Sequence, residues 1–299
     1  MKDFNELIQL VQERPQKKKV AVAGAHDEHT LEGVYRAFEQ GLVEPVLIGD
    51  RQEIIEIMER EGFSFPVSDI IDIRDEQESA KRAVELIREG QADFLMKGKL
   101  QTADLLKQVV HREHGLKDSE VMSHVGLFEV PGCSKLLVIT DGGMLPHPDL
   151  QQKVRIVENA VKLLKNLGYD TVKVAALAAA EVVNPKLKES TDGAELKRMN
   201  QEGLLTDCLV EGPISYDLMI SEEAARIKGY GSPITGDTDI LLVPDMAAGN
   251  ILAKALMYHA GARMAGVIVG AKVPIVLVSR GASSEEKFYS LALAAAVAR

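Results

Sequence analysis

Several residue types that mark particular classes of protein are scarce or absent in this chain of 299 residues. It has no tryptophan, and aromatic residues make up only 4%, so it lacks the side chains on which nucleic-acid bases stack. The formal net charge of −10 is opposite to that of surfaces that bind phosphate backbones. No apolar run reaches the length of about 18 residues expected of a membrane-spanning helix. These absences predict that neither nucleic acid nor a membrane is a partner.

Cysteine is also scarce. Cys133 and Cys208 lie far apart and form no CxxC motif, which is typical of a reducing cytoplasm and predicts no metal site. Each thiol is a candidate nucleophile in principle, but Cys208 opens an apolar strand and Cys133 follows a Pro-Gly turn with no general base beside it. The N-terminal stretch reads as an amphipathic helix that ends at Pro15 and not as a signal peptide. We therefore expect a cytoplasmic protein.

Apolar runs of strand length alternate with stretches of helical spacing through the first 110 residues. The predicted strands are Lys19–Gly24, Pro45–Asp50, Ser68–Ile73 and Ala92–Gly98. The predicted helices are Glu28–Gly41, Arg51–Gly62, Glu76–Gly90 and Thr102–Val110. This alternation, with short Gly-containing links, predicts βαβ units and a parallel sheet.

The pattern changes near Val121. The segments VMSHVGLFEVPG and SKLLVITDGG read as two strands without a helix between them, which predicts a crossing into a second domain with antiparallel pairing. A strong helix at Leu150–Leu167, three more buried strands and a helix at Met246–His259 follow. The polar stretch Asn184–Gly203 reads as a loop plus a short helix. The sequence thus predicts an α/β protein of two α/β domains with a cleft between them.

Ligands in open α/β sheets bind beyond the carboxyl ends of the strands, so polar residues that follow strands are the candidates for a site. Ser279 and Arg280 follow the buried strand of VPIVLVSRGASSEEKFYSLALA, and Glu285 and Glu286 begin the helix after them. A guanidinium, a hydroxyl and a helix N-terminus are groups that favour phosphate. This turn therefore predicts an anion site with carboxylates able to accept a proton.

A second cluster of charge surrounds the turn after the fourth predicted strand. Lys97, Lys99 and Lys107 lie there together with Thr102. They fit an anion pocket in an acidic protein, and equally a solvated lysine cluster in which Thr102 is the N-cap.

Two further motifs leave their alternatives open. The first predicted strand ends in GAHDEHT, which is not GxGxxG; its histidines, His26 and His29, fit a solvated helix start better than a metal site with no third ligand. In TGDTDILLVPDMAAGN, Gly249 lies inside a helix, where glycine costs about 1 kcal/mol relative to alanine. Close helix packing and approach of a ligand to the backbone both explain it.

Five segments, in their order and spacing, resemble the phosphate acetyltransferase/phosphate butyryltransferase family: MKGKLQTADLLK, DGGMLPHPDLQQK, EGPISYD, GDTDILLVPDMAAGNILAKAL and VPIVLVSRGASSEEKFYS. The resemblance covers most of the chain, and the turn at Lys97 and the PDMAAGNILAKAL helix are closer to the butyryl branch. It implies that acyl-CoA and phosphate exchange with acyl phosphate and CoA. Coenzyme A is then a co-substrate, and no metal or permanently bound cofactor is needed.

The resemblance also implies the fold of isocitrate and isopropylmalate dehydrogenases and a homodimer. In that fold the C-terminal strand and helix complete the first domain. The expected domains are therefore 1–122 plus 271–299, and 123–270, with the active site in the cleft between them.

The resemblance assigns roles to individual residues. Arg280 would hold the phosphoryl group, for which a bidentate guanidinium is suited, and Ser279 would donate to the reacting thiol or the oxyanion. Glu286 stands where the family has its proposed base, often an aspartate, and the neighbouring Glu285 remains the alternative. Lys107 lies near a position that is arginine in acetyl members. Lysine keeps the positive charge but lacks the bidentate geometry of the guanidinium. The expected substrate-binding residues are Lys97, Gly98, Lys99, Thr102, Lys107, Ser123, Gly236, Asp237 and Asn250.

Three other functions compete with butyryl transfer. The first is the same chemistry on an acetyl group, with overlapping substrates because one methylene gives only about 1–3 kcal/mol of discrimination. The second is a decarboxylating dehydrogenase of the same fold, for which neither a nicotinamide site nor paired metal-binding aspartates is evident. The third is a non-catalytic CoA- or phosphate-binding protein, against which the set of Ser279, Arg280 and Glu286 argues.

Overall fold

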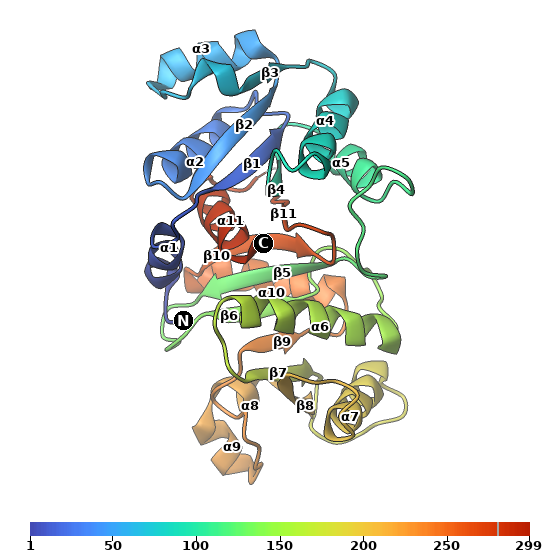
Figure 1. Cartoon of the computed structure of the whole chain (residues 1–299). Coiled ribbons are helices and arrows are strands. Elements are labelled where there is room, and N and C mark those ends of the chain that lie inside the picture. Colours follow the sequence, from blue (N-terminus) through green and yellow to red (C-terminus); the bar gives the residue numbers. More distant parts are fainter. Residues whose placement is uncertain (280) are drawn as a thin grey trace. The chain divides into compact units, whose positions relative to one another are not determined.

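The computed structural model describes residues 1–279 and 281–299. The chain folds into two compact units, one formed by Met1–Met122 with Met264–Arg299 and the other by Ser123–Arg263. The first unit therefore contains both blue N-terminal and red C-terminal elements in Figure 1. The domains expected at 1–122 plus 271–299 and at 123–270 stay a prediction, because a compact unit is defined by contacts and a domain by independent folding.

The first unit is built from alternating strands and helices. Its strands are β1 (Lys18–Ala23), β2 (Val43–Gly49), β3 (Ile70–Asp72), β4 (Phe94–Lys97), β10 (Arg263–Val269) and β11 (Ile275–Val276). Its helices are α1 (Phe4–Gln12), α2 (Glu28–Glu39), α3 (Arg51–Glu61), α4 (Glu76–Arg88), α5 (Thr102–Val109) and α11 (Ser284–Val297), with a 3₁₀ turn at Val67–Asp69. The alternation predicted for the first 110 residues is confirmed.

Aspartates determine where three of these helices begin. Asp27, Asp50 and Asp75 each follow a strand in extended conformation, and each side chain accepts a hydrogen bond from a backbone N–H in the first turn of α2, α3 or α4. An N-cap of this kind contributes about 1 kcal/mol to stability. The same caps hold the turns after β1, β2 and β3 at one edge of the sheet.

The sheet of the first unit has the strand order β3-β2-β1-β4-β11-β10. All neighbouring pairs from β3 to β11 are parallel, and β10 is antiparallel to β11. Ala23 pairs with Lys97, and Met96 pairs with Val276. The chain therefore leaves β1, β4 and β11 at the same, carboxyl edge of the sheet, although these strands are far apart in sequence.

Helix α11 is the central helix of this unit, and every residue from Lys287 to Val297 is buried. It packs so closely on α2 that a Cβ atom added to Gly33 would lie 2.9 Å from the Lys287 Cβ and 3.0 Å from the Ser284 carbonyl oxygen. Phe4 of α1 stacks on Tyr289, with ring centroids 4.3 Å apart. This packing fixes the start of α11 relative to the carboxyl ends of the strands.

The second unit has the strand order β5-β6-β9-β7-β8, with β5 antiparallel to β6 and the other pairs parallel. Its strands are β5 (Ser123–Glu129), β6 (Leu137–Thr140), β7 (Val172–Leu177), β8 (Cys208–Ile214) and β9 (Ile240–Leu242). Its helices are α6 (Leu150–Asn166), α7 (Lys188–Gln201), α8 (Tyr216–Ile220), α9 (Glu222–Lys228) and α10 (Met246–Ala260). The antiparallel pairing predicted where the pattern changes is confirmed.

Helix α7 corrects the prediction of a loop with a short helix between Asn184 and Gly203. It has 14 residues. Its buried face carries Asp192 and Gly193 as well as Leu196, so no apolar periodicity reveals it. Lys153 of α6 donates to Asp192 at 2.8 Å, and a Cβ on Gly193 would lie 3.1 Å from the Pro213 Cα.

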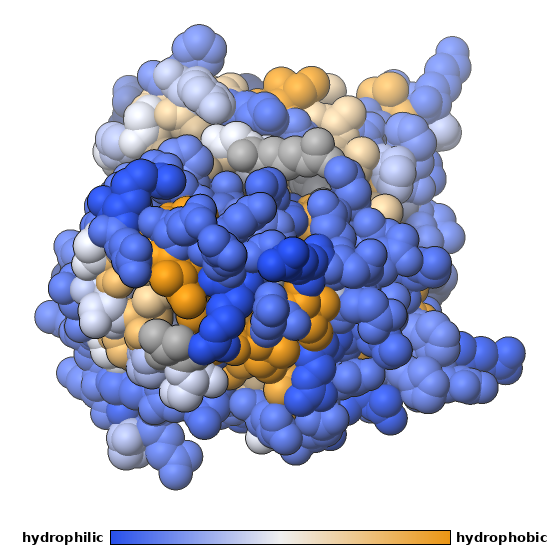
Figure 2. Space-filling model, turned by 90° about the horizontal axis from the view of Figure 1, so that it is seen from above, coloured by the Kyte–Doolittle hydropathy of each residue, from blue (hydrophilic) through white to orange (hydrophobic). Residues whose placement is uncertain are grey.

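The face seen in Figure 2 is mostly hydrophilic, and its apolar patches are interrupted by hydrophilic side chains. Within residues 1–279 and 281–299, no helix is both long enough and apolar enough to cross a bilayer.

Candidate active site

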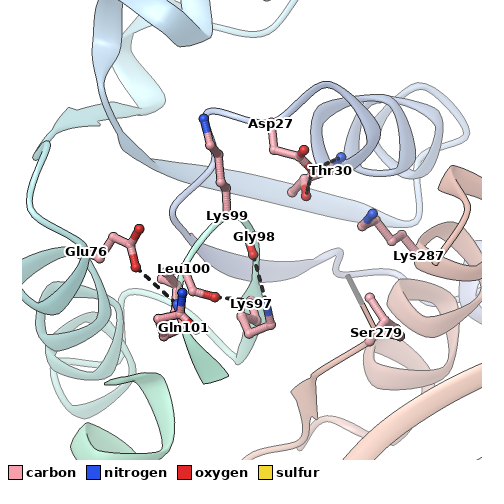
Figure 3. Close-up of a pocket in the computed structure, with 11 residues that line it drawn as sticks. Asp27, Thr30, Glu76, Lys97, Gly98, Lys99, Leu100, Gln101, Ser279 and Lys287 are labelled. Atoms are coloured by element: carbon pink, nitrogen blue, oxygen red, sulfur yellow. Dashed lines mark hydrogen bonds between the residues drawn. The ribbon is translucent and has the colours of Figure 1, made fainter. Parts of the chain in front are cut away.

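A pocket of about 390 Å³ opens at the carboxyl edge of the first unit's sheet (Figure 3). This volume lies in the range of roughly 300–1,000 Å³ that is typical of small-molecule sites. Three lysines and two carboxylates are among its described lining residues, which are Asp27, Thr30, Glu76, Lys97, Gly98, Lys99, Leu100, Gln101, Val278, Ser279 and Lys287. In Figure 3, Ser279 and Lys287 lie on one side of the pocket and Glu76 and Gln101 on the other. The structure thus brings four residues predicted for the site, Ser279, Lys97, Gly98 and Lys99, to one pocket.

Gly98 allows two of the pocket's turns to approach each other. A Cβ atom at this position would lie 2.2 Å from the carbonyl oxygen of Gly24, the residue after β1. The Gly98 N–H donates to Ala23 at 2.8 Å, and the Lys99 N–H donates to Gly24 at 2.7 Å. Gly24 itself has a φ of +69°, which favours glycine. The glycine predicted to bind substrate therefore has a packing role.

Lys97 is 5% exposed, and its ammonium is held by the turn that follows it. The Nζ atom donates to the carbonyl oxygens of Gly98 at 3.0 Å and Leu100 at 3.1 Å. Lys99 is exposed, and its Nζ lies 3.9 Å from a Glu53 carboxylate oxygen. The two lysines differ in setting: one positive charge is fixed inside the turn and the other lies in solvent at the rim.

The turn between β11 and α11 presents Ser279 to the pocket. The Ala282 N–H donates to the Ser279 carbonyl at 3.0 Å. Ser283 is the N-cap of α11, and its hydroxyl accepts from the Glu286 N–H at 3.1 Å. Arg280, the predicted phosphate ligand, lies outside the described residues.

The two candidate bases occupy the first turn of α11. Glu285 is exposed and accepts a hydrogen bond from the Tyr289 hydroxyl at 3.2 Å. Glu286 is half-buried and acts electrostatically on Lys287. Neither carboxylate is among the described residues that line the pocket. Glu286 as the base, with Glu285 as the alternative, stays a prediction.

Lys287 and Asp27 line the pocket but are not among the site residues predicted from the sequence. The Lys287 Nζ donates to the Ala282 carbonyl at 3.2 Å. Burial lowers the pKa of Lys287. The negative charges of Asp27, Glu286 and Glu32 act to raise this pKa, but the effect of burial is larger. No sequence signal distinguished Lys287, because it follows Ser284, Glu285 and Glu286 in the polar first turn of α11.

Asp27 is engaged by Thr30. Its Oδ2 accepts from the Thr30 N–H at 2.9 Å and from the Thr30 hydroxyl at 2.5 Å. Burial works to raise the pKa of Asp27, but these hydrogen bonds and the charge of Lys287 hold the pKa below its usual value. Asp27 is therefore an anion at neutral pH.

Thr102 and Lys107 both lie on α5 and are not lining residues of this pocket. The interpretation of Thr102 as the N-cap is wrong, because Gln101 is the N-cap and Thr102 is the first helical residue. Lys107 is exposed in the last turn. Their expected contact with substrate stays a prediction.

In the second unit, Ser123 and Asn250 both lie at the carboxyl edge of the sheet. Ser123 begins β5, which runs antiparallel to β6, and its hydroxyl accepts from Asn159 at 3.1 Å. Asn250 is exposed in the first turns of α10. A Cβ on Gly249 would lie 2.8 Å from the Gly142 Cα, so close packing accounts for the glycine within this helix.

Gly236 and Asp237 lie at the opposite edge of that sheet, before the start of β9. The Asp237 carboxylate pairs with Lys135 at 2.5 Å and with Lys173. These lysines, hydrogen-bonded to it, are the main cause of its lowered pKa. This local geometry favours a structural role and does not bring Gly236 or Asp237 together with Ser123 and Asn250.

Asp141, at the carboxyl end of β6, organises its turn. Its carboxylate accepts from the backbone N–H groups of Gly143 and Met144, both at 2.9 Å. Burial nevertheless raises the pKa of Asp141. Beside it, burial lowers the pKa of His124 to about 4, so this imidazole is neutral at neutral pH.

Neither cysteine is activated. Burial raises the pKa of Cys133, and burial together with the charges of Asp207 and Glu158 raises the pKa of Cys208 to about 11. Both thiols are therefore protonated at neutral pH, and the protonated form is a weak nucleophile.

The two histidines of GAHDEHT have separate surroundings. A Cβ on Gly49 would lie 2.7 Å from the His26 Nδ1, and His29 lies 3.9 Å from Glu32 at the surface. Within the described part of the chain, no three His, Cys, Asp or Glu side chains are grouped as metal ligands.

Comparison with known proteins gives this site a family context. The family described as phosphate acetyl/butaryl transferase matches residues 76–295. A phosphate acetyltransferase of Thermotoga maritima is 45% identical, over 95% of this chain and 97% of its own length. A phosphate butyryltransferase of Clostridium acetobutylicum is 40% identical, over 100% of this chain and 99% of its own.

Solved structures agree on the fold. A branched-chain phosphotransacylase from Enterococcus faecalis is 37% identical and superimposes with a TM-score of 0.84, covering 94% of this chain and 99% of its own. A 4-hydroxythreonine-4-phosphate dehydrogenase from Burkholderia phymatum, 17% identical, gives a TM-score of 0.59 over 95% of this chain and 99% of its own. The second likeness concerns the fold alone, and together they confirm the predicted dehydrogenase-like α/β fold class.

Proposed function

This chain belongs to the phosphate acetyl/butaryl transferase family, and from that membership we propose that it exchanges phosphate and coenzyme A on a short-chain acyl group. The main reaction is butyryl-CoA plus phosphate in exchange with butyryl phosphate plus CoA. Coenzyme A is a co-substrate, and the reaction requires no permanently bound cofactor.

The observation that carries this proposal is the meeting of Ser279 with Lys97, Lys99 and Lys287 in one pocket. Three ammonium groups face two carboxylates there, in a chain whose net charge is −10. A local excess of positive charge of this kind attracts an anionic substrate. Phosphate, acyl phosphate and CoA are all anions.

In the proposed mechanism, a carboxylate of α11 accepts the proton of the CoA thiol. Glu286 is our choice for this base, with Glu285 as the alternative. The thiolate attacks the carbonyl carbon of the acyl phosphate, a C–S bond forms, and the C–O bond to phosphate breaks. Arg280 holds the departing phosphate, and Ser279 donates a hydrogen bond to the thiol sulfur or the oxyanion, which stabilises the charge that develops.

We propose direct transfer between the two substrates, without an acyl-enzyme. The raised pKa values of Cys133 and Cys208 support this, because a thiol must ionise before it attacks a carbonyl. An enzyme in which both cysteines are replaced by alanine should keep its kcat.

In this proposal Lys97 and Lys99 contribute positive charge at the pocket of the first unit. Contact of Thr102, Lys107, Ser123 and Asn250 with substrate stays a prediction. Substrate binding by Gly236 and Asp237 stays a prediction, which the ion pairs of Asp237 with two lysines do not support.

We further propose a homodimer formed through α10. Ile251 is 68% exposed and Tyr258 is 78% exposed, and their spacing of seven residues places them on one face of the helix. Gly249 is the only buried residue of this apolar helix, and a second copy of the chain is the occupant we propose for the exposed face. In sedimentation at micromolar concentration, Ile251→Asp should shift the protein towards monomer.

The compartment that we propose is the cytoplasm. Cys133 and Cys208 are both free thiols, as is usual where glutathione keeps cysteines reduced. The proposed partners are small molecules, with neither nucleic acid nor a membrane among them, in keeping with the net charge of −10.

A phosphate-dependent release of free CoA from butyryl-CoA tests the proposed reaction. The wild-type protein should release the thiol only when inorganic phosphate is present. A protein that binds butyryl-CoA but releases no thiol would be a binding protein. The second candidate, phosphate acetyltransferase, is favoured by the 45% identity to the Thermotoga maritima protein, and acetyl-CoA in the same assay distinguishes it.

A further inference from the structure

Lys287 is a buried lysine whose ammonium faces a cavity. It occupies the first turns of α11 and is 5% exposed, yet it is among the residues that line the pocket. Its Cβ lies against α2 at the position of Gly33. The side chain is thus held between two helices with its charged end at the ligand site.

The hydrogen bonds of this ammonium are incomplete. An ammonium group has three N–H donors. Within residues 1–279 and 281–299, the Lys287 Nζ makes one hydrogen bond, to the Ala282 carbonyl at 3.2 Å, and has no carboxylate partner within ion-pair distance. Burying a charge without a partner is costly, so this arrangement calls for a ligand.

The carboxylates near Lys287 act on it through space. Asp27 is already engaged by the N–H and the hydroxyl of Thr30. Glu286 and Glu32 favour the charged lysine electrostatically, as Asp27 does. An anion in the cavity would supply hydrogen-bond acceptors for the remaining N–H groups of the Lys287 ammonium.

The other lysines of the pocket are placed differently. Lys97 already donates to two carbonyl oxygens of its own turn, and Lys99 is exposed at the rim. Lys287 therefore combines burial, spare donors and proximity to Ser279, which are the properties of an anion ligand.

We propose that Lys287 binds the phosphoryl group that the enzyme transfers, with its ammonium donating to an oxygen of inorganic phosphate or of the acyl phosphate. This inference rests on the proposed function. It adds the ammonium of Lys287, on α11, to Arg280, the phosphate ligand predicted from the sequence.

Phosphate binding at Lys287 should depend on pH. Bound phosphate stabilises the charged form of Lys287, so binding falls as pH rises and the lysine loses its proton. The charged groups that face this part of the pocket are Asp27, Glu32, Glu76, Lys97, Lys99 and Glu286. The burial-lowered pKa of Lys287 places this loss at a lower pH than for an exposed lysine.

The test is Lys287→Met, which keeps an unbranched side chain and removes the charge. With butyryl-CoA and inorganic phosphate as substrates, the KM for phosphate should rise roughly 10- to 100-fold, the loss expected for one hydrogen bond to a charged group. The KM for butyryl-CoA should stay within about twofold, because the proposed contact of Lys287 is to phosphate and not to the thioester substrate. Lys81→Met is the matched control, since Lys81 is an exposed lysine of α4 and its loss changes the net charge equally.

A second variant distinguishes loss of the positive charge from loss of the fold. Lys287→Gln retains an N–H that can donate to Ala282 and should show the same selective loss; circular dichroism and thermal unfolding verify the fold of both variants. An unchanged phosphate KM in either folded variant overturns the proposal. A rise confined to the KM for butyryl-CoA also overturns it, because Lys287 would then bind a phosphate of coenzyme A.

A binding measurement separates this inference from the proposed reaction. Calorimetry with inorganic phosphate, and separately with adenosine 3′,5′-bisphosphate, requires no turnover. The wild-type protein should bind inorganic phosphate, and Lys287→Met should weaken that binding while leaving the nucleotide unaffected. If the wild-type protein shows no acyl transfer but Lys287→Met still weakens phosphate binding, the proposed function fails and the Lys287 site stands.

Discussion

Replacing Gly98 by alanine should both destabilise the first unit and impair catalysis. The added Cβ would lie 2.2 Å from the Gly24 carbonyl oxygen and 3.0 Å from that of Ala23. Both obstacles are backbone atoms, so relief requires the turns after β1 and β4 to separate by about an ångström, from 2.2 Å to normal contact.

The magnitude follows from the contacts that this separation disturbs. Overpacking costs about 1–3 kcal/mol. Separation also weakens the Gly98–Ala23 and Lys99–Gly24 hydrogen bonds, each worth about 0.5–1.5 kcal/mol. The expected loss is therefore about 2–6 kcal/mol, a large part of a typical total of about 5–15 kcal/mol.

Urea unfolding measures this loss of stability. The accompanying displacement of Lys97 and Lys99 should lower kcat/KM. Gly231→Ala is the control, because a Cβ there meets no atom within 4 Å, and it should change neither quantity appreciably. A Gly98→Ala protein with the wild-type urea midpoint and wild-type kcat/KM would refute the argument that the pocket depends on this close approach.

The remaining predictions concern charge. Arg280→Ala should remove most activity with little loss of stability, and near wild-type kcat/KM would contradict its role as phosphate ligand. Glu286→Gln should lower kcat by roughly 10²- to 10⁴-fold, as loss of a general base does; if Glu285→Gln lowers kcat instead, the base is one residue earlier. Burial opposes a low pKa at Asp192, but the hydrogen bonds from Lys153 and a second lysine prevail and lower that pKa. Because the folded pKa lies below the unfolded value of about 3.9, the ionised carboxylate stabilises the protein above that pH. This stabilisation is lost as pH falls through the folded pKa. Asp192→Asn should therefore flatten the fall in urea midpoint between pH 5 and pH 3, and an equally steep fall in the variant would contradict this.

Much of the fold was predictable because local and global signals agree. Apolar runs such as Lys19–Gly24 form strands buried on both faces, and capping aspartates such as Asp50 mark the helix starts. The length of helix α7 was underestimated, because the helix buries Asp192 through an ion pair and not through an apolar stripe. Sequence periodicity does not register a polar residue that is buried with a partner.

The candidate site was predictable in part for the same reason. Lys97 ends β4, Gly98 and Ser279 follow strands, and parallel pairing brings these strand ends together. Lys287 was not found, because its significance depends on burial between α2 and α11, which no local pattern encodes. Asp237 also follows this reasoning: it precedes a strand, and the structure accordingly places it at the edge opposite to Ser123.

The most direct test of the proposed function is the release of inorganic phosphate from acyl phosphates. Acetyl, butyryl and isobutyryl phosphate are each incubated with the protein, with and without CoA, and compared by kcat/KM. We predict release that depends on CoA for all three, with the highest kcat/KM for butyryl phosphate. A highest value for acetyl phosphate would move the assignment to the acetyl reaction, and no CoA-dependent release from any of the three would contradict acyl transfer altogether.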